Sequence, residues 1–228
     1  MVKSIAIVGG SSDIAKSTIS SMSADNYKFH VLVRNDSYTD ELSALGVSVV
    51  LGDATSEEDI KNFISGVKES GEIHAILHCV GSFAVRPPHA INKEAFETVI
   101  STNLTSAFLT LSIAGKAMLS QGHGRMVFMS SVAGSLGLVN HEAISAAKGG
   151  VESMVRSAAA TYANRGLRIN AVAPGLTDTK LASPIMSNET ASQAASQKIP
   201  IKRVGQKEEV ANVIKWLLTE APENFTGQ

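Results

Sequence analysis

The sequence predicts an α/β protein with a doubly wound parallel sheet in a single domain. Short runs of β-branched and other apolar residues alternate with longer stretches in which apolar residues recur at helical spacing. Strands that alternate with helices in this way form a parallel sheet with right-handed crossovers. With 228 residues, of which 44% are hydrophobic, the chain can bury one sizeable core. We therefore expect one domain over residues 1–228.

The first strand is expected at residues 4–8, and a glycine turn follows it directly. The turn reads GGSSD over residues 9–13, and apolar residues then recur at helical spacing from Ile14 to Met22. Backbone N–H groups at a helix N-terminus point at a bound ligand, and the helix dipole favours an anion there. A strand, a glycine turn and a helix without a spacer therefore predict a phosphate-binding turn of the Rossmann type.

The remaining elements continue the alternation. Strands are expected at 29–33, 47–51, 73–80, 127–129 and 167–172, and helices at about 56–70, 92–119 and 141–164. The residues from about 179 to 200 have no strong periodicity. No internal repeat, low-complexity tract or linker divides the chain.

Charge and composition exclude several classes of function. A formal net charge of -1 gives no electrostatic basis for binding nucleic acid or an anionic membrane. The single cysteine, Cys79, excludes an intramolecular disulfide and suits a reducing compartment. The N-terminal apolar run is too short for a signal peptide, and no run approaches the roughly 20 apolar residues of a membrane span. We expect a soluble, cytoplasmic protein whose partner is a small molecule, and no metal site.

One stretch carries the candidate chemistry. The apolar run Met126–Met129 leads into Ser130 and Ser131, so a buried strand is expected to emerge into solvent at these serines. An alanine-rich helix that contains Lys148 follows after a small-residue loop. In open α/β sheets, ligands bind at the carboxyl ends of the strands. Ser131 and Lys148 are therefore candidate catalytic residues.

With Ser131 and Lys148 at this spacing, the chain resembles the short-chain dehydrogenase/reductase family. That family carries a serine, a tyrosine about thirteen residues later and a lysine four residues after the tyrosine. The resemblance implies that the serine holds the substrate oxygen, that the tyrosine transfers the proton, and that the lysine lowers the tyrosine pKa and binds the nicotinamide ribose. In this sequence Ile144 stands at the tyrosine position.

Because isoleucine has no proton to give, the proton donor must either differ or be lost. His141 lies about one helical turn before Ile144 on the side of Lys148. It stands seven residues before Lys148, the spacing at which enoyl-thioester reductases of the same superfamily place their tyrosine. A histidine titrates near neutral pH and can replace a tyrosine as general acid. The alternative is that His141 is a solvated residue at the helix start.

The glycine turn keeps only part of the family pattern T-G-x3-G-x-G. Gly9 is retained, whereas Asp13 and Ala15 replace the second and third glycines. Asp13 introduces a carboxylate where a phosphate approaches. One interpretation is that Asp13 caps the helix, as aspartate does well, and we expect its side chain to turn away from the phosphate.

Further matches extend over nearly the whole chain. Asp53 follows the third strand, where the family uses a carboxylate to accept from the adenine amino group. Residues 78–81, HCVG, replace the family's N-N-A-G, and Asn103 matches the asparagine that kinks the long helix and orders a water near the lysine. Residues 170–179 match N-x-V-x-P-G-x3-T, which holds the nicotinamide carboxamide. Residues 179–200 occupy the place of the substrate lid.

Arg34 closes the second strand, where an acidic residue would bind the ribose hydroxyls of NAD. A guanidinium fits a 2′-phosphate instead, so NADP is favoured over NAD. The alternative is an ordinary surface arginine.

The resemblance thus implies two sets of site residues. The catalytic set is Asn103, Ser131, His141 and Lys148. The cofactor-binding set is Gly9, Ser11, Ser12, Asp13, Ile14, Arg34, Asp53, Ala54, Cys79, Val80, Gly81, Lys148, Pro174, Gly175, Thr177 and Thr179.

Two functions fit these motifs. The first is an NADP(H)-dependent reductase of a carbonyl or enoyl substrate with a rearranged proton donor, and the retained Ser131, Lys148 and Asn103 favour it. The second is a catalytically silent NADP(H)-binding protein, a sensor or a non-catalytic subunit, and the lost tyrosine favours it.

We expect a homotetramer or dimer held by the helices at 92–119 and 141–164, because small residues let helices approach closely. Residues 225–228 resemble the segment that leads into a seventh strand, so we expect either that the chain continues beyond this sequence or that the sheet lacks its last edge strand.

Overall fold

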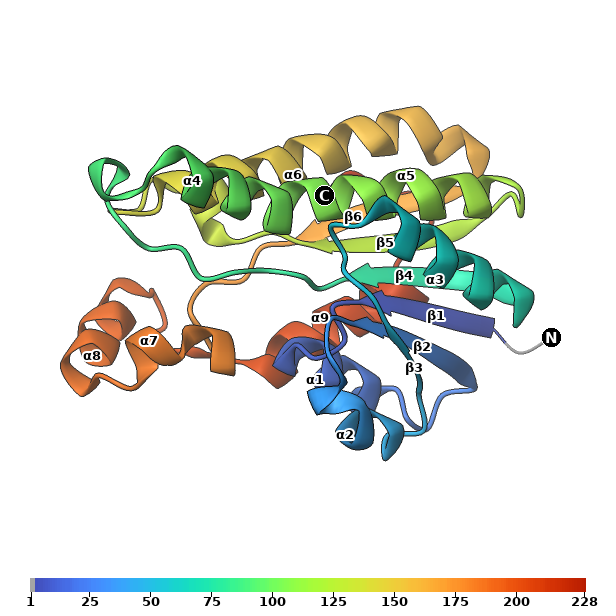
Figure 1. Cartoon of the computed structure of the whole chain (residues 1–228), viewed down its shortest axis with the longest axis horizontal. Helices are drawn as coiled ribbons and strands as arrows, with labels where there is room; N and C mark the ends of the chain where they lie inside the picture. The colour runs from blue at the N-terminus through green and yellow to red at the C-terminus, as the bar shows by residue number, and fades with distance from the viewer. Residues whose placement is uncertain (1–2) are drawn as a thin grey trace.

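A computed structural model describes residues 3–228 and confirms the α/β fold. Its central sheet has six parallel strands in the order β3-β2-β1-β4-β5-β6 (Figure 1). The strands are β1 Lys3–Val8, β2 Tyr27–Val33, β3 Ser48–Leu51, β4 Glu72–His78, β5 Gly124–Met129 and β6 Leu167–Val172. The strand order reverses between β1 and β4, and an α/β sheet binds ligands at such a switch point.

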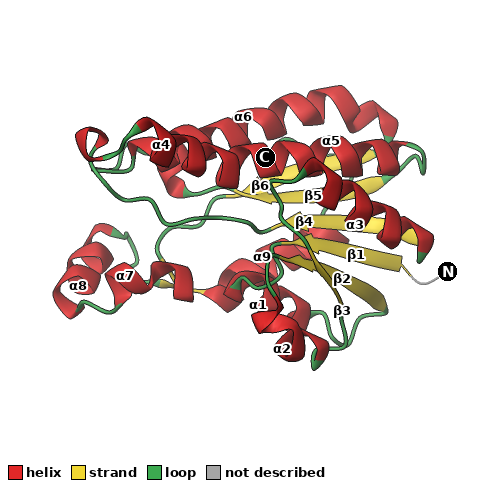
Figure 2. Ribbon diagram, in the orientation of Figure 1, coloured by secondary structure: helices red, strands yellow, loops and turns green. Residues whose placement is uncertain are grey.

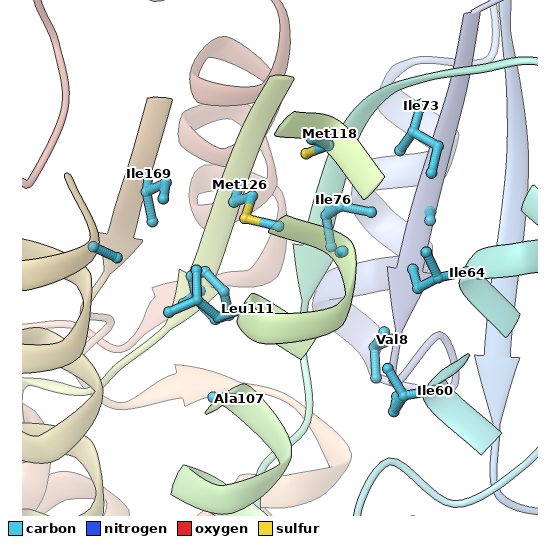
Figure 3. Packing of buried hydrophobic residues seen from close by; sticks show 14 of the residues in the cluster. Val8, Ile60, Ile64, Ile73, Ile76, Ala107, Leu111, Met118, Met126 and Ile169 are labelled. Atoms are coloured by element: carbon cyan, nitrogen blue, oxygen red, sulfur yellow. The ribbon is translucent and has the colours of Figure 1, made fainter. Parts of the chain in front are cut away.

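Helices cover both faces of the sheet (Figure 2). One layer contains α3 (Glu57–Glu69), α5 (Ser106–Leu119) and α6 (Glu142–Tyr162), and the other contains α1 (Asp13–Ser21), the short α2 (Thr39–Ser43) and α9 (Lys207–Thr219). The core on the first face joins Val8, Ile76 and Met126 of the sheet to Ile60 of α3 and Leu111 of α5 (Figure 3). Burial of these apolar faces positions the strand ends that carry the site.

The long helix expected at 92–119 is interrupted. α4 (Lys93–Ile100) leads into a π-helical turn, Ser101–Thr105, and then into α5. By length and composition, Lys93–Leu119 is apolar enough to cross a membrane, so the expectation that no segment approaches such a span was wrong. In this fold its residues Ala107, Leu111 and Met118 are buried in the core.

The lid segment contains helices, although its sequence has no strong periodicity. A short parallel pair, β7 (Thr177–Asp178) and β8 (Gly205–Gln206), frames a 3-10 turn (Lys180–Ala182), α7 (Ser183–Met186) and α8 (Glu189–Lys198). α8 has no buried residue, so no apolar stripe marks it in the sequence. These helices lie apart from the helix layers, on the side that the carboxyl ends of the strands face (Figure 1).

The last residues run beside the open edge of the sheet. Gly227 N donates to Ile169 O at 2.8 Å, and Ala171 N donates to Gln228 O at 2.7 Å. Residues 227–228 therefore continue the hydrogen bonding of the central sheet beyond β6. Within the described residues the central sheet nevertheless has six strands, because β7 belongs to the separate pair with β8.

Candidate active site

The ends of β5 and β6 bring the predicted serine and the predicted Pro-Gly step together. Ser130 N donates to Val172 O at 2.7 Å, and Val132 N donates to Pro174 O at 3.0 Å. Ser131 is extended and precedes a 3-10 turn, where its Oγ accepts from Ala133 N at 3.2 Å. Its hydroxyl hydrogen remains available to donate to a substrate oxygen.

Lys148 reaches this strand end from α6. Its side chain is buried, and Nζ donates to Met129 O at 2.8 Å. Burial lowers the pKa of Lys148 from 10.5 to about 8, while the nearby Cys79 thiol opposes the shift. A cation held in this way titrates close to physiological pH, which is a property of lysines that bind or move protons.

Asn103 lies in the π-helical turn, so the prediction that it marks a break in the long helix is confirmed. Its Nδ2 donates to Val99 O at 2.9 Å and to Ser82 Oγ at 2.7 Å, and its Oδ1 accepts from Ser82 N at 3.2 Å. A Cβ on Gly81 would lie 3.6 Å from Asn103 Oδ1 and 3.8 Å from Lys148 Nζ. The structure therefore brings Gly81, Asn103 and Lys148 together.

Ile144 faces apolar neighbours. It is 7% exposed and belongs to a small cluster with Val99, Ala133, Ala143 and Ala147. The side chain at the tyrosine position thus completes the packing between α4, α6 and the turn after Ser131. It offers no polar atom to the site.

His141 stands at the N-cap position of α6 rather than inside the helix as expected. Its carbonyl accepts from Ser145 N at 2.7 Å, and its ring Nδ1 lies 2.7 Å from Val139 O. Within residues 3–228 no hydrogen bond joins His141 to Ser131 or Lys148. Because a helix rises 1.5 Å per residue, a seven-residue separation places His141 about 10 Å from Lys148 along the axis.

The glycine turn is held tightly between β2 and β4. Gly9 has φ +86°, and both Gly9 N and Gly10 N donate to Leu32 O, at 3.0 and 3.1 Å. A Cβ on Gly10 would lie 1.9 Å from a methyl carbon of Val31. The first turn of α1 follows at once, and its N–H groups have no intrahelical partner. These features fit the pyrophosphate of a dinucleotide.

The interpretation that Asp13 caps α1 is wrong. Ser12 occupies the N-cap position, and Ser12 Oγ accepts from Cys79 Sγ at 3.3 Å. Asp13 is the first residue of the helix, and its carboxylate accepts from Lys180 N at 2.6 Å. This carboxylate is thus engaged with the start of the lid segment.

Arg34 and Asp53 end two neighbouring strands. Arg34 is exposed directly after β2. Asp53 accepts from Thr55 N and Thr55 Oγ1, both at 2.8 Å. These bonds, and then the charge of Arg34, lower the pKa of Asp53, so a carboxylate and a guanidinium share this end of the sheet. The pair fits the adenosine end of a dinucleotide, including a 2′-phosphate.

The other predicted cofactor residues lie near the glycine turn or on the segment after β6. Val80 contacts the turn, since a Cβ on Gly9 would lie 2.8 Å from it. Thr179 Oγ1 donates to Thr177 O at 3.3 Å, and Thr177 Oγ1 donates to Gly175 O at 3.1 Å. Three further members are half-buried: Ser11, Ile14 and Ala54. β4 ends at His78, so Cys79 and Val80 follow the strand instead of belonging to it.

Two residues near the site escaped the sequence analysis as functional candidates. His78 is buried, its Nε2 lies 3.0 Å from Ser106 Oγ, and its Nδ1 has no partner within residues 3–228. Burial, and then the charge of Lys148, lower the pKa of His78 to about 3, so the ring is neutral. Glu152 accepts from Ser130 Oγ and Ser135 Oγ, both at 2.8 Å. Its only sequence signal is its place one turn after Lys148.

Comparisons with known proteins agree with this geometry. A family model described as enoyl-(acyl carrier protein) reductase matches residues 9–228. The 3-oxoacyl-[acyl-carrier-protein] reductase MabA of Mycobacterium bovis is 32% identical over 226 residues, which cover 99% of this chain and 89% of MabA.

Two solved structures share the fold over nearly the whole of this chain. A short-chain type dehydrogenase/reductase from Mycobacterium ulcerans superposes with a TM-score of 0.93 at 27% identity, covering 99% of this chain and 86% of that one. ElxO with NADP bound gives a TM-score of 0.92 at 26% identity, covering 100% of this chain and 95% of ElxO.

Proposed function

The chain belongs to the short-chain dehydrogenase/reductase family, and from this premise we propose that it is an NADP(H)-dependent reductase of a carbonyl or enoyl substrate. The observation that carries the proposal is the group formed by Gly81, Asn103 and buried Lys148, whose Nζ donates to Met129 O at the end of β5, two residues before Ser131. A buried lysine is costly to maintain, since burial disfavours its charge. Retention of this lysine together with the serine supports a working site.

The proposed roles follow from the side chains. A bound nicotinamide supplies the hydride that reduces the substrate carbon. Ser131 donates a hydrogen bond to the substrate oxygen, and Lys148 binds the nicotinamide ribose. Residues 9–15 bind the pyrophosphate, and Thr177 and Thr179 lie on the segment proposed to hold the carboxamide.

The proton is proposed to come from His141. Because the Val139 carbonyl lies 2.7 Å from Nδ1, Nδ1 carries a hydrogen and Nε2 is the atom that gains and releases the catalytic proton. The carbonyl thereby orients the ring.

The proposed cofactor is NADPH. Exposed Arg34 beside Asp53 offers a planar fork for a 2′-phosphate. ElxO, which shares the fold at 26% identity, has a structure with NADP bound. Both observations support NADP(H) over NAD(H).

A second candidate function is a silent NADP(H)-binding protein. The burial of Ile144 in an apolar cluster favours it, because no polar group replaces the tyrosine hydroxyl there. Such a protein binds NADPH but does not oxidise it with any carbonyl.

The decisive experiment measures NADPH oxidation with a panel of ketones, 3-oxoacyl thioesters and enoyl thioesters. We expect turnover with at least one class, and we expect Ser131→Ala to abolish it while NADPH binding persists. Binding of NADPH without any turnover favours the silent protein. Absence of NADPH binding contradicts both functions.

We further propose a cytoplasmic homotetramer or dimer. Phe96 and Phe108 of the long helix are 40% and 56% exposed, and we propose that they contribute to the contact between subunits. Light scattering at micromolar concentration tests this, and a monomer refutes it.

A further inference from the structure

We propose that Asp13 is a positioning residue that fixes the start of the substrate lid against the phosphate-binding turn. The family pattern has a glycine at this position, which cannot make the bond described here. Asp13 thereby joins the nucleotide part of the site to the lid.

The bond itself is short and spans the chain. Asp13 Oδ2 accepts from Lys180 N at 2.6 Å, and the two residues are separated by 167 positions in the sequence. The Asp13 side chain is only 11% exposed. A hydrogen bond to an ionised carboxylate is stronger than one between neutral groups. The donor is a backbone N–H, so the bond depends on the residue at 13 and not on the lysine side chain.

The charge of Asp13 is compensated locally. Lys16 Nζ lies 3.5 Å from Asp13 Oδ1 and 2.8 Å from Glu41 Oε1. Burial lowers the pKa of Lys16, but the bond to Glu41 and the charges of Glu41 and Asp13 raise it on balance, so Lys16 stays charged. The Nζ atoms of Lys16 and Lys180 lie 5.6 and 5.7 Å from the centre of the Tyr38 ring. Asp13 thus has a cationic neighbour, Lys16, within the protein itself.

The contact reaches the catalytic group through one further residue. Leu181 follows Lys180, and a Cβ on Gly81 would lie 3.9 Å from Leu181 Cδ2 and 3.8 Å from Lys148 Nζ. Holding Lys180 in place therefore holds Leu181 against the loop that carries Gly81. Release of the Asp13 bond therefore frees the segment that carries Leu181.

The test compares Asp13→Ala with Asp13→Asn. Asparagine keeps an oxygen that accepts from Lys180 N, whereas alanine removes the acceptor. We expect Asp13→Ala to speed amide hydrogen exchange in the peptide spanning residues 176–186 by about 10- to 100-fold. We expect Asp13→Asn to restore exchange to within about three- to tenfold of the wild type, because a neutral acceptor keeps about half of the bond's free energy.

A matched control is Glu41→Gln. Glu41 also binds Lys16 but does not contact Lys180 N. We expect this variant to leave exchange of the 176–186 peptide unchanged. The measurement needs neither cofactor nor turnover, so its outcome is separate from that of the proposed reductase activity. In an active enzyme, Asp13→Ala should also raise KM for the carbonyl substrate more than it lowers kcat.

Wild-type exchange rates in Asp13→Ala would overturn the proposal. Equal acceleration in Asp13→Ala and Asp13→Asn would overturn it as well, since charge and not the bond would then be responsible. If Asp13→Ala does not fold, Asp13→Gly replaces it, because glycine is the family residue and also lacks the acceptor. The same acceleration is then required of Asp13→Gly.

Discussion

The glycine turn and the start of α6 both depart from the family pattern, and the structure accommodates Asp13 of the turn and Ile144 of α6 in opposite ways. At the turn, the added carboxylate of Asp13 makes a new hydrogen bond to Lys180 N across the protein. At α6, Ile144 takes the place of a tyrosine and packs against Val99 and Ala133. One departure adds a polar contact, and the other removes a polar group without replacing it.

The difference shows which substitutions can be interpreted from contacts alone. A polar side chain that is nearly buried must find a partner, and the partner indicates its role. An apolar side chain packs wherever there is room, so its contacts say nothing about the chemistry that was lost. The nucleotide half therefore permits direct predictions, whereas the catalytic half requires measurements of turnover.

The largest expected effect concerns His141. If His141 transfers the proton, His141→Ala should reduce turnover by about 10²- to 10⁴-fold with little change in NADPH affinity. Steady-state kinetics and fluorescence titration of NADPH measure the two quantities. The reason is that a general acid acts in the transition state, while the cofactor contacts lie elsewhere.

Ile144→Tyr is the complementary variant. It places a phenol next to Lys148 and should create or raise carbonyl reduction. An inactive wild type, no effect of His141→Ala and activity in Ile144→Tyr together would falsify the rearranged donor and leave the silent binder.

The next effect concerns Lys148. Its pKa is lowered from 10.5 to about 8 in the folded protein, so between these values the unfolded chain binds more protons and stability rises with pH. Lys148→Met removes the buried cation and should raise the free energy of unfolding at pH 7 by about 3 kcal/mol. Urea unfolding at pH 7 and pH 9.5 measures it. The free energy of unfolding of the wild type should increase by about 2 kcal/mol from pH 7 to pH 9.5, and that of Lys148→Met should not increase. An equal increase in both proteins would mean that another group causes the pH dependence.

The smallest effect lies in the nucleotide half. Arg34→Ala should weaken NADPH binding by roughly 1.5–3 kcal/mol, because charge-assisted bonds to the 2′-phosphate are lost. NADH binding should not change, since NADH lacks that phosphate. Isothermal titration with both cofactors measures the difference. An equal loss for both means that Arg34 does not read the phosphate.

The sequence predicts the sheet well because buried strands leave continuous apolar runs. β6 was expected at Leu167–Val172, where it is found, and the glycine turn was expected directly after β1. The lid helices were missed because α8 buries no residue and therefore has no apolar stripe. The Asp13–Lys180 bond was missed because its partners are distant in sequence and Lys180 contributes only a backbone atom. His141 was expected as the first residue of its helix and is the N-cap, one position earlier in the helix nomenclature, because helix ends are poorly marked in sequence.

The π-helical turn at Ser101–Thr105 sets the rotation of α4 relative to α5. An α-helix advances about 100° per residue, so the extra residue in this turn lets α4 and α5 face different neighbours. Val99 then faces Ile144 and the candidate site, while Leu111 faces the sheet. Deleting one residue within the turn would rotate α4 away from α6 and leave α5 in the core. One residue in this turn therefore decides whether α4 packs beside the candidate site, while the packing of α5 on the sheet does not depend on it.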